Sequence, residues 1–330
     1  MRWTRYSLWL LASAIWALQI SIGEATETPD VSLDDLLNTK ISTAAKYEQT
    51  TREAPASITI VTAEDIAAHG HKTLEDVFRT VRGFYVSNDR NYSYVGTRGF
   101  GRPTDYNNRI LLLINGHTRN ENIEGSAAVG ADFALNMDAV ERIEIVRGPG
   151  SALYGTYAVF AVVNVITKSG NTLDGLSVSG ELGSYGRREF GAAFGALSSG
   201  GVDLSFSGNW ADVDGQELHY REFDDPATNH GIAQNLDWER YHSILGTCSA
   251  GGLSIQGYFS KREKGIPTAP WETVFNDGDA RTLDRAAHAD IRYERALGAT
   301  KVVSFRGYLD HYYYTGAYPY EILWLDEYNG

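Results

Sequence analysis

The second half of the chain consists of segments in which apolar and polar residues alternate with a period of two. In residues 202–210, every apolar side chain falls on one face of an extended strand and every polar side chain on the other. Segments of about ten residues with this pattern follow one another from residue 175, and several end in aromatic residues such as Trp210 and Tyr293. The pattern predicts antiparallel strands with one apolar and one polar face, as in a soluble β-sandwich or in a β-barrel that crosses an outer membrane.

The N-terminus helps to choose between these two architectures. Arg2 and Arg5 precede an apolar stretch, residues 8–18, and small residues suited to signal-peptidase cleavage follow it. The alternative, a membrane anchor, would need about 20 apolar residues. We therefore assign residues 1–25 to a signal peptide. Because no other segment is apolar enough for a membrane helix, a place in the membrane requires a barrel, and the export signal favours the barrel over the sandwich.

The composition excludes several functional classes. Lys and Arg total 29 and Asp and Glu total 42, so the net charge is −13, which argues against a nucleic-acid surface. One cysteine, Cys248, permits neither an internal disulfide nor a zinc site built on several cysteines. No recognisable phosphate-binding loop, catalytic triad or helical histidine pair is present. The sequence predicts no enzyme, no cofactor and no metal site. Acids at 212–214 and 224–225 are predicted to be solvated loop residues, with calcium binding as the alternative.

Three regions follow the signal peptide. Residues 26–53 are polar and rich in threonine, which indicates a mobile leader. Residues 54–170 mix helix and strand signals and predict a compact α+β domain, and residues 171–330 hold the alternating segments. The expected elements of the compact domain are strands at 58–61, 110–114, 140–145 and 162–167, a helix capped by Thr62, and a second helix at 73–79.

Ordered motifs in the compact domain carry a resemblance to a known family. They lie at residues 54–66, 74–84, 98–100, 112–116, 140–155 and 163–168. Together they resemble the plug domain of TonB-dependent outer-membrane receptors. Three positions depart from the family pattern, with Arg82 in place of Pro, Asn115 in place of Asp and Ala161 in place of Gly.

The resemblance implies an α+β plug domain followed by an antiparallel transmembrane β-barrel. Residues 171–330 provide 160 residues, enough for about seven strands, whereas plugged barrels of this kind have about 22. The chain also stops at Asn329-Gly330 and not at a terminal aromatic residue. We therefore expect a partial sequence that holds the signal peptide, the plug and about the first third of the barrel.

Three groups of site residues follow from the resemblance. The candidate TonB box, a short β-prone segment in the leader, is Lys40, Ile41, Ser42, Thr43 and Ala44. The candidate plug–barrel charge network is Arg98, Glu141, Arg142, Glu144 and Arg147. The candidate ligand contacts at the plug apex are Asn88, Arg90, Tyr92, Tyr94, Arg102 and Tyr106. The alternatives are an ordinary exposed Thr-rich stretch for the first group and charges that only solubilise the plug for the second.

The implied function is active uptake across the Gram-negative outer membrane. The expected partners are periplasmic TonB with ExbB–ExbD, membrane lipid and a scarce large ligand, with a ferric siderophore placed first and cobalamin or haem as alternatives. TonB would pull the box by adding a strand to its own sheet edge. A binding-only receptor or signal transducer, a passive porin and a soluble periplasmic enzyme remain as other functional hypotheses.

Overall fold

The computed structural model describes residues 40–41, 43, 49–50, 57–102, 104–298 and 301–321. The predicted signal peptide, and Ser42 and Ala44 of the candidate box, lie outside these residues. The strands are β1 (Lys40–Ile41), β2 (Gln49–Thr50), β3 (Ser57–Thr62), β4 (Phe84–Asn88), β5 (Ser93–Thr97), β6 (Ile110–Ile114), β7 (His117–Thr118), β8 (Val140–Arg147), β9 (Ala161–Thr167), β10 (Gly175–Leu182), β11 (Arg188–Leu197), β12 (Asp203–Val213), β13 (Leu218–His219), β14 (Ile232–Ala233), β15 (Glu239–Ala250), β16 (Leu253–Gly265), β17 (Arg281–Ala296) and β18 (Val302–Ala317). The helices are α3 (Ala63–His69), α4 (Leu74–Thr80), α5 (Ser151–Tyr154) and α6 (Gly170–Leu173), with 3₁₀ turns η1 (Met137–Ala139), η2 (Arg221–Phe223), η3 (Pro226–Gly231) and η4 (Pro270–Glu272).

The plug domain is built on a five-stranded mixed sheet in the order β3-β8-β9-β6-β7. Strands β6 and β9 run parallel and the other neighbours run antiparallel. Thr62 and Thr73 each form a capping box at the start of α3 and α4, because the hydroxyl accepts the backbone N–H three residues on. Both helices and the strands at 58–61, 110–114, 140–145 and 162–167 are confirmed. Fully buried Leu, Ile, Val and Phe side chains from the sheet and from α4 form one core.

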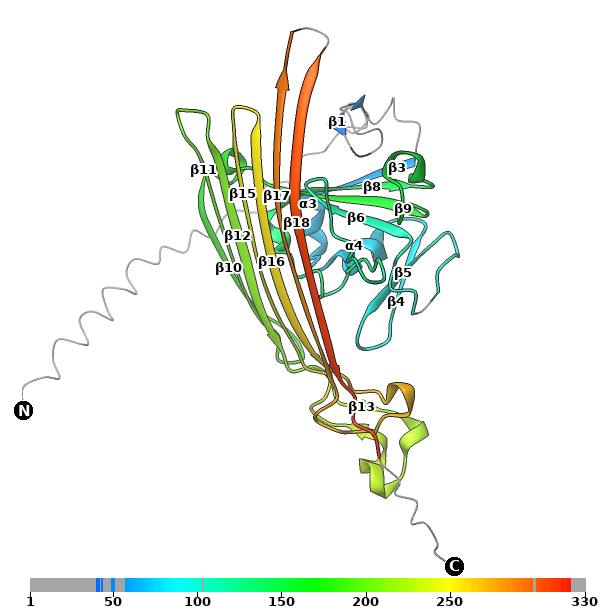
Figure 1. Cartoon of the computed structure of the whole chain (residues 1–330). Coiled ribbons are helices and arrows are strands. Elements are labelled where there is room, and N and C mark those ends of the chain that lie inside the picture. The colour runs from blue at the N-terminus through cyan, green and yellow to red at the C-terminus, as the bar shows by residue number, and fades with distance from the viewer. Residues whose placement is uncertain are drawn as a thin grey trace, which may run out of the picture. The chain divides into compact units, whose positions relative to one another are not determined.

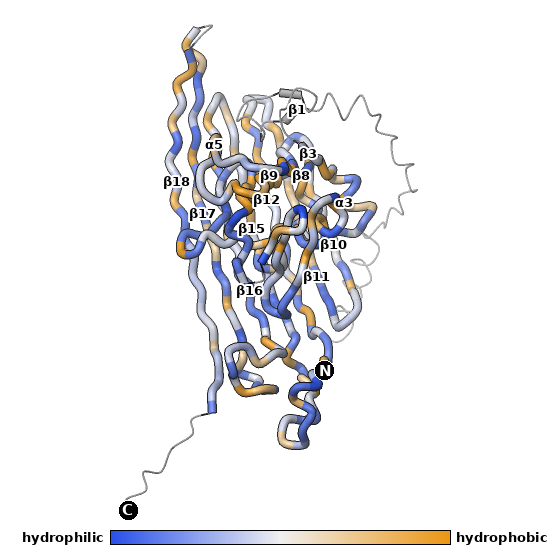
Figure 2. The backbone as a smooth tube through the Cα atoms, turned by 90° about the vertical axis from the view of Figure 1, so that its right-hand side faces the viewer, coloured by the Kyte–Doolittle hydropathy of each residue, from blue (hydrophilic) through white to orange (hydrophobic). Residues whose placement is uncertain are grey.

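Seven long strands form a second, wholly antiparallel sheet, which we call the long sheet. Its order is β10-β11-β12-β15-β16-β17-β18, so each of these strands pairs with the next one along the chain. In β12 the small polar residues Ser205, Ser207 and Asn209 are buried, whereas Phe206 and Trp210 are exposed. Figure 2 shows hydrophobic and hydrophilic residues alternating along these strands. The alternation predicted from the sequence is confirmed, and the apolar side chains form the outward face.

Strand β15 breaks the alternation, and the sequence pattern did not reveal it. Tyr241 and Leu245 are buried on the inward face, whereas Ile244 is exposed on the outward face. Apolar residues therefore occupy both faces of this strand. The reason is tertiary, because Leu245 belongs to the same core as buried plug residues, including Phe133.

Direct contacts join the plug domain to the long sheet. Tyr258 of β16 is buried in the plug core, and its hydroxyl donates a hydrogen bond to the carbonyl of Phe133. Figure 1 shows the long strands running past the plug elements. Among the described residues, no helix combines the length and the apolar character needed to cross a membrane.

Candidate functional site

The hairpin of β4 and β5 carries four of the six predicted ligand contacts, three of them at its tip. Asp89 Oδ1 accepts the backbone N–H groups of Asn91 and Tyr92 at 2.8 and 2.7 Å, and Asn88 Oδ1 accepts that of Arg90 at 2.6 Å. Asp and Asn side chains commonly stabilise such turns by bonding to the backbone two residues on. The tip is therefore held in one conformation.

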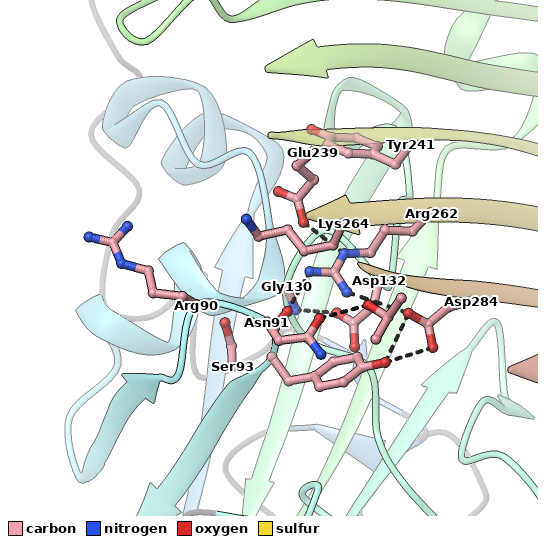
Figure 3. Close-up of polar contacts among 12 residues, drawn as sticks. Arg90, Asn91, Ser93, Gly130, Asp132, Glu239, Tyr241, Arg262, Lys264 and Asp284 are labelled. Atoms are coloured by element: carbon pink, nitrogen blue, oxygen red, sulfur yellow. Dashed lines mark hydrogen bonds and ion pairs between the residues drawn. The ribbon is translucent and has the colours of Figure 1, made fainter. Parts of the chain in front are cut away.

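A guanidinium of the long sheet meets this tip. Arg262 of β16 bonds through Nε to Glu239 at 2.7 Å and through Nη1 to Asp284 at 3.4 Å. Its Nη2 donates to the carbonyl of Asn91, and its Cζ lies 5.2 Å from the ring centroid of Tyr92. Figure 3 shows Arg262 among its polar partners. Because Arg262 is only 4% exposed, these partners replace water around a buried charge.

Tyr92 makes the second contact between the tip and the long sheet. Its hydroxyl donates to the two oxygens of Asp284 at 3.0 and 3.1 Å, and Tyr312 donates to the same carboxylate at 3.0 Å. Burial, with the negative charge of Asp284 beside the ring, raises the pKa of Tyr92 above its usual value. The phenol is therefore a neutral donor at physiological pH.

The predicted apex residues fall into different surroundings. Tyr92 and Tyr106 pack edge to face at 5.8 Å and line a cavity of about 260 Å³. Asn88 and Arg90 line a larger polar cavity of about 980 Å³, where Arg90 lies 3.5 Å from Asp237. Tyr94 is buried and donates to Asp89 at 2.7 Å, and Arg102 is exposed. Their assignment as ligand contacts stays a prediction.

Asp132 lies beside both cavities, close to the Arg262 cluster. Its Oδ1 accepts the backbone N–H of Gly130 at 2.8 Å. Burial raises the pKa of Asp132 to about 6. The positive charge of Arg262 opposes this rise, and the negative charges of Asp284 and Glu239 add to it. Ionisation of Asp132 therefore destabilises the folded plug.

Replacing Asp132 by Asn is expected to stabilise the protein at pH 7.5 and to change little near pH 4. A carboxyl whose pKa is raised on folding stabilises the fold below its unfolded value near 3.8, and that contribution is lost as the pH rises through about 6. The gain at pH 7.5 is at most about 3 kcal/mol. The difference in thermal midpoint between variant and parent, measured in detergent at both pH values, checks this. A difference that does not depend on pH would contradict it.

A second polar cluster between plug and long sheet was not found from the sequence. His117 of β7 is 1% exposed, with Nδ1 2.9 Å from Asp290 and Nε2 2.7 Å from Asp310. Arg292 and Arg306 both bond to Asp290 at 2.7 Å. The alternating pattern showed that the inward positions of β17 are polar. It could not show their partner, because His117 lies 173 residues from Asp290 in the chain.

The predicted charge network makes its described side-chain bonds with residues of the plug domain and of the leader. Arg142 bonds to Glu141 and, at 3.0 Å, to Glu144, and Arg147 donates to the carbonyl of Arg82 at 2.7 Å. Arg98 occupies a left-handed turn with φ 54°. The contacts with the long sheet described above involve other residues. The assignment of this group to the plug–barrel interface stays a prediction.

Thr43 of the candidate box is buried against the plug domain. Thr43 is 2% exposed, and both its N–H, at 3.3 Å, and its hydroxyl donate to Glu144, which is fully buried and also bonded to Arg142. Asn164 donates to the Thr43 hydroxyl at 3.2 Å, and Tyr154 donates to the Thr43 carbonyl at 2.7 Å. One leader residue therefore holds four hydrogen bonds to the plug.

Replacing Glu144 by Ala is expected to release the leader from the plug. The change removes two hydrogen bonds to a charged acceptor, about 1.5–3 kcal/mol each, and shifts the bound leader at least tenfold toward the free form. A spin label introduced by Lys40→Cys in a Cys248→Ser background should change from mostly immobile to mostly mobile. Glu141→Ala is the matched control, because it removes another partner of Arg142 without touching Thr43. An immobile label in the Glu144 variant would contradict the expectation.

No group of three or more His, Cys, Asp or Glu side chains suited to a metal ion occurs among the described residues. The acids considered for calcium include Asp212, which lies 3.1 Å from Arg240, and Asp214, which lies 3.7 Å from Arg188. The prediction that all these acids are loop residues is wrong for Asp212, which belongs to strand β12. Calcium binding by the acids of this region stays an untested alternative.

Comparison with known proteins assigns the family. Residues 50–162 match the family model described as the TonB-dependent receptor plug domain. The chain belongs to the TonB-dependent receptors. Proteins of this family lie in the outer membrane of Gram-negative bacteria, and this TonB-dependent receptor chain is assigned to that membrane.

Curated relatives agree with this family. The chain is 33% identical over 234 residues to the vitamin B12 transporter BtuB of Vibrio vulnificus, and the match covers 68% of this chain and 36% of the relative. It is 33% identical over 134 residues to the iron-regulated outer membrane virulence protein of Vibrio cholerae, covering 39% of this chain and 20% of the relative. The chain thus spans about a third or less of the length of these two relatives.

Solved structures show the same fold. The siderophore receptor PiuA of Acinetobacter baumannii superposes with a TM-score of 0.59 at 14% identity, covering 86% of this chain and 40% of that one. The ferric yersiniabactin uptake receptor FyuA of Yersinia pestis gives a TM-score of 0.58 at 16% identity, covering 81% and 42%. The long sheet therefore corresponds to part of a TonB-dependent receptor barrel.

Proposed function

We propose that this chain is the plug-bearing part of an energised importer, which takes up a scarce large ligand across the outer membrane. The ligand binds near the β4–β5 tip, and TonB, driven by ExbB–ExbD, pulls the leader from the other end of the plug domain. The ligand belongs to the ferric siderophore or cobalamin class, since relatives named for both match this chain. No chemical conversion of the ligand is proposed.

One observation supports this proposal most. The chain holds both an aromatic cavity beside Tyr92, which is large enough for one edge of a large ligand, and the candidate box residue Thr43, bonded to the buried Glu144. Hydrogen bonds fasten Thr43 of the leader to the plug. Such contacts are individually modest, so a pulling partner is able to break them in sequence.

Uptake by whole cells tests the proposal. Cells that carry the protein should accumulate labelled cyanocobalamin or a labelled ferric siderophore, and should grow when that nutrient is limiting. Deletion of TonB, or collapse of the proton gradient, should reduce uptake to the level of cells without the protein. Uptake that continues without TonB would instead indicate a passive pore. Binding without any uptake would indicate a binding-only receptor or a signal transducer.

A further inference from the structure

The cavity beside Tyr92 is aromatic and acidic. It lies between the plug tip and the ends of β17 and β18, and its aromatic walls include Tyr106, Tyr312 and Trp271. Its volume of about 260 Å³ is close to the lower limit for a small-molecule site, so it fits one edge of a large ligand and not the whole. Aromatic faces suit a ligand with flat apolar parts.

Negative charge dominates the lining of this cavity. Six carboxylates line it, those of Asp89, Glu121, Glu124, Asp132, Asp284 and Asp310, against one guanidinium, that of Arg119. Two of them have a basic partner, since Asp284 is paired with Arg262 and Asp310 lies 2.7 Å from His117. Glu121 and Asp89 instead accept hydrogen bonds from neutral donors, which are backbone N–H groups and, for Asp89, also the Tyr94 hydroxyl. These neutral donors satisfy the oxygens without cancelling their charge. A ligand that carries several negative charges would meet repulsion here.

Arg119 is the exception in this lining. It is 8% exposed, its Nε has no hydrogen-bond partner, and it forms no ion pair with any described residue. Its guanidinium lies 4.5 Å from the ring centroid of Tyr258, and the two side chains interact by a cation–π contact and a hydrogen bond. A buried N–H group without an acceptor is costly, so the unpartnered Nε of Arg119 is best explained by an acceptor that arrives with a ligand.

We propose that the cavity selects a ligand without net negative charge, which places one acceptor oxygen on Arg119 and N–H or O–H donors on the surrounding carboxylates. This inference rests on the proposed function and narrows its ligand class. A dipolar, amide-rich corrinoid or a neutral ferric hydroxamate fits this chemistry. A ferric tris-catecholate with three negative charges does not.

Equilibrium binding to the full-length protein, purified in detergent, tests the inference without TonB. The probes are two pairs, each with an uncharged and a threefold negative member. One pair is cyanocobalamin and its tricarboxylate, in which three side-chain amides are hydrolysed. The other is a neutral ferric trihydroxamate and a ferric tris-catecholate. The uncharged member of at least one pair should bind at least tenfold more tightly than its trianion at low salt, and the difference should shrink in 0.5 M salt.

Substitutions locate the effect. Glu124 is an exposed loop residue that lines the cavity. Glu124→Lys should therefore reduce the ratio of the affinities for the uncharged and the trianionic probe about threefold. Glu64→Lys, on an exposed position of α3 away from the cavity, should not change it. Arg119→Gln should weaken binding of the uncharged probe at least tenfold, and Arg119→Lys should restore part of the lost affinity.

Two results would overturn the inference. One is that, in every pair that binds, the trianion binds as tightly as its uncharged counterpart, and the other is the absence of binding by both uncharged probes. A different result would overturn the proposed function. If the protein binds the uncharged probes more tightly but uptake does not depend on TonB, it is not an energised importer, and the inference about the ligand class still holds.

Discussion

Ile41→Pro is expected to reduce ligand uptake to background while leaving ligand binding unchanged. Ile41 lies in β1, which pairs antiparallel with Gln49–Thr50 in this structure. A segment that is pulled by strand addition must offer its backbone N–H and carbonyl groups to the sheet edge of the partner. Proline removes the N–H and fixes φ, so it blocks the pairing at the residue where it stands. The expected loss of uptake is at least tenfold, measured as cell-associated label in TonB-containing cells.

Ile41→Val is the matched control for this experiment. Valine keeps the backbone donor and the β-branched side chain, so uptake should stay near the parental level. Binding of the same ligand to purified protein should be equal in parent and both variants, since none of the described leader residues lines the cavity. Normal uptake by the proline variant would show that the box lies elsewhere or that TonB does not drive transport.

Arg262→Met is expected to loosen the plug tip from the long sheet. The change leaves Glu239 and Asp284 without their shared cation and removes the donor to the carbonyl of Asn91. Removing one partner of a buried ion pair costs about 3–5 kcal/mol. Amide hydrogens of the β4–β5 hairpin should therefore exchange at least 100-fold faster, because their protection depends on this contact. Hydrogen exchange of residues 84–97 in detergent-purified protein measures this.

Arg240→Met provides the comparison. Arg240 comes from the neighbouring strand β15 and pairs with Asp212 at 3.1 Å, but its side chain is 60% exposed. Exposed pairs contribute about 0–1 kcal/mol, so exchange at the hairpin should change little. Equal exchange in both variants would contradict the role assigned to Arg262.

Local signals in the sequence predicted much of the plug fold. The Thr62 and Thr73 capping boxes are formed by residues three positions apart, and short-range hydrogen bonds of this kind need no tertiary information. The candidate box was placed from the family resemblance, and the bonds of Thr43 to the plug became visible only in the structure. The sequence could not predict the partner of Thr43, because Glu144 lies 101 residues away.

The type of architecture follows from local patterns in the amino-acid sequence. An alternating pattern assigns each side chain of a strand to one of two faces, and the buried Ser205 and exposed Phe206 follow that assignment. The pattern says nothing about what covers the inward face. Only the tertiary structure brought Asn91 to Arg262, 171 residues apart, and packed Leu245 into the plug core. The physical reason is that periodicity is a property of one strand, whereas a buried charge or an inward apolar residue is stabilised by partners from other parts of the chain.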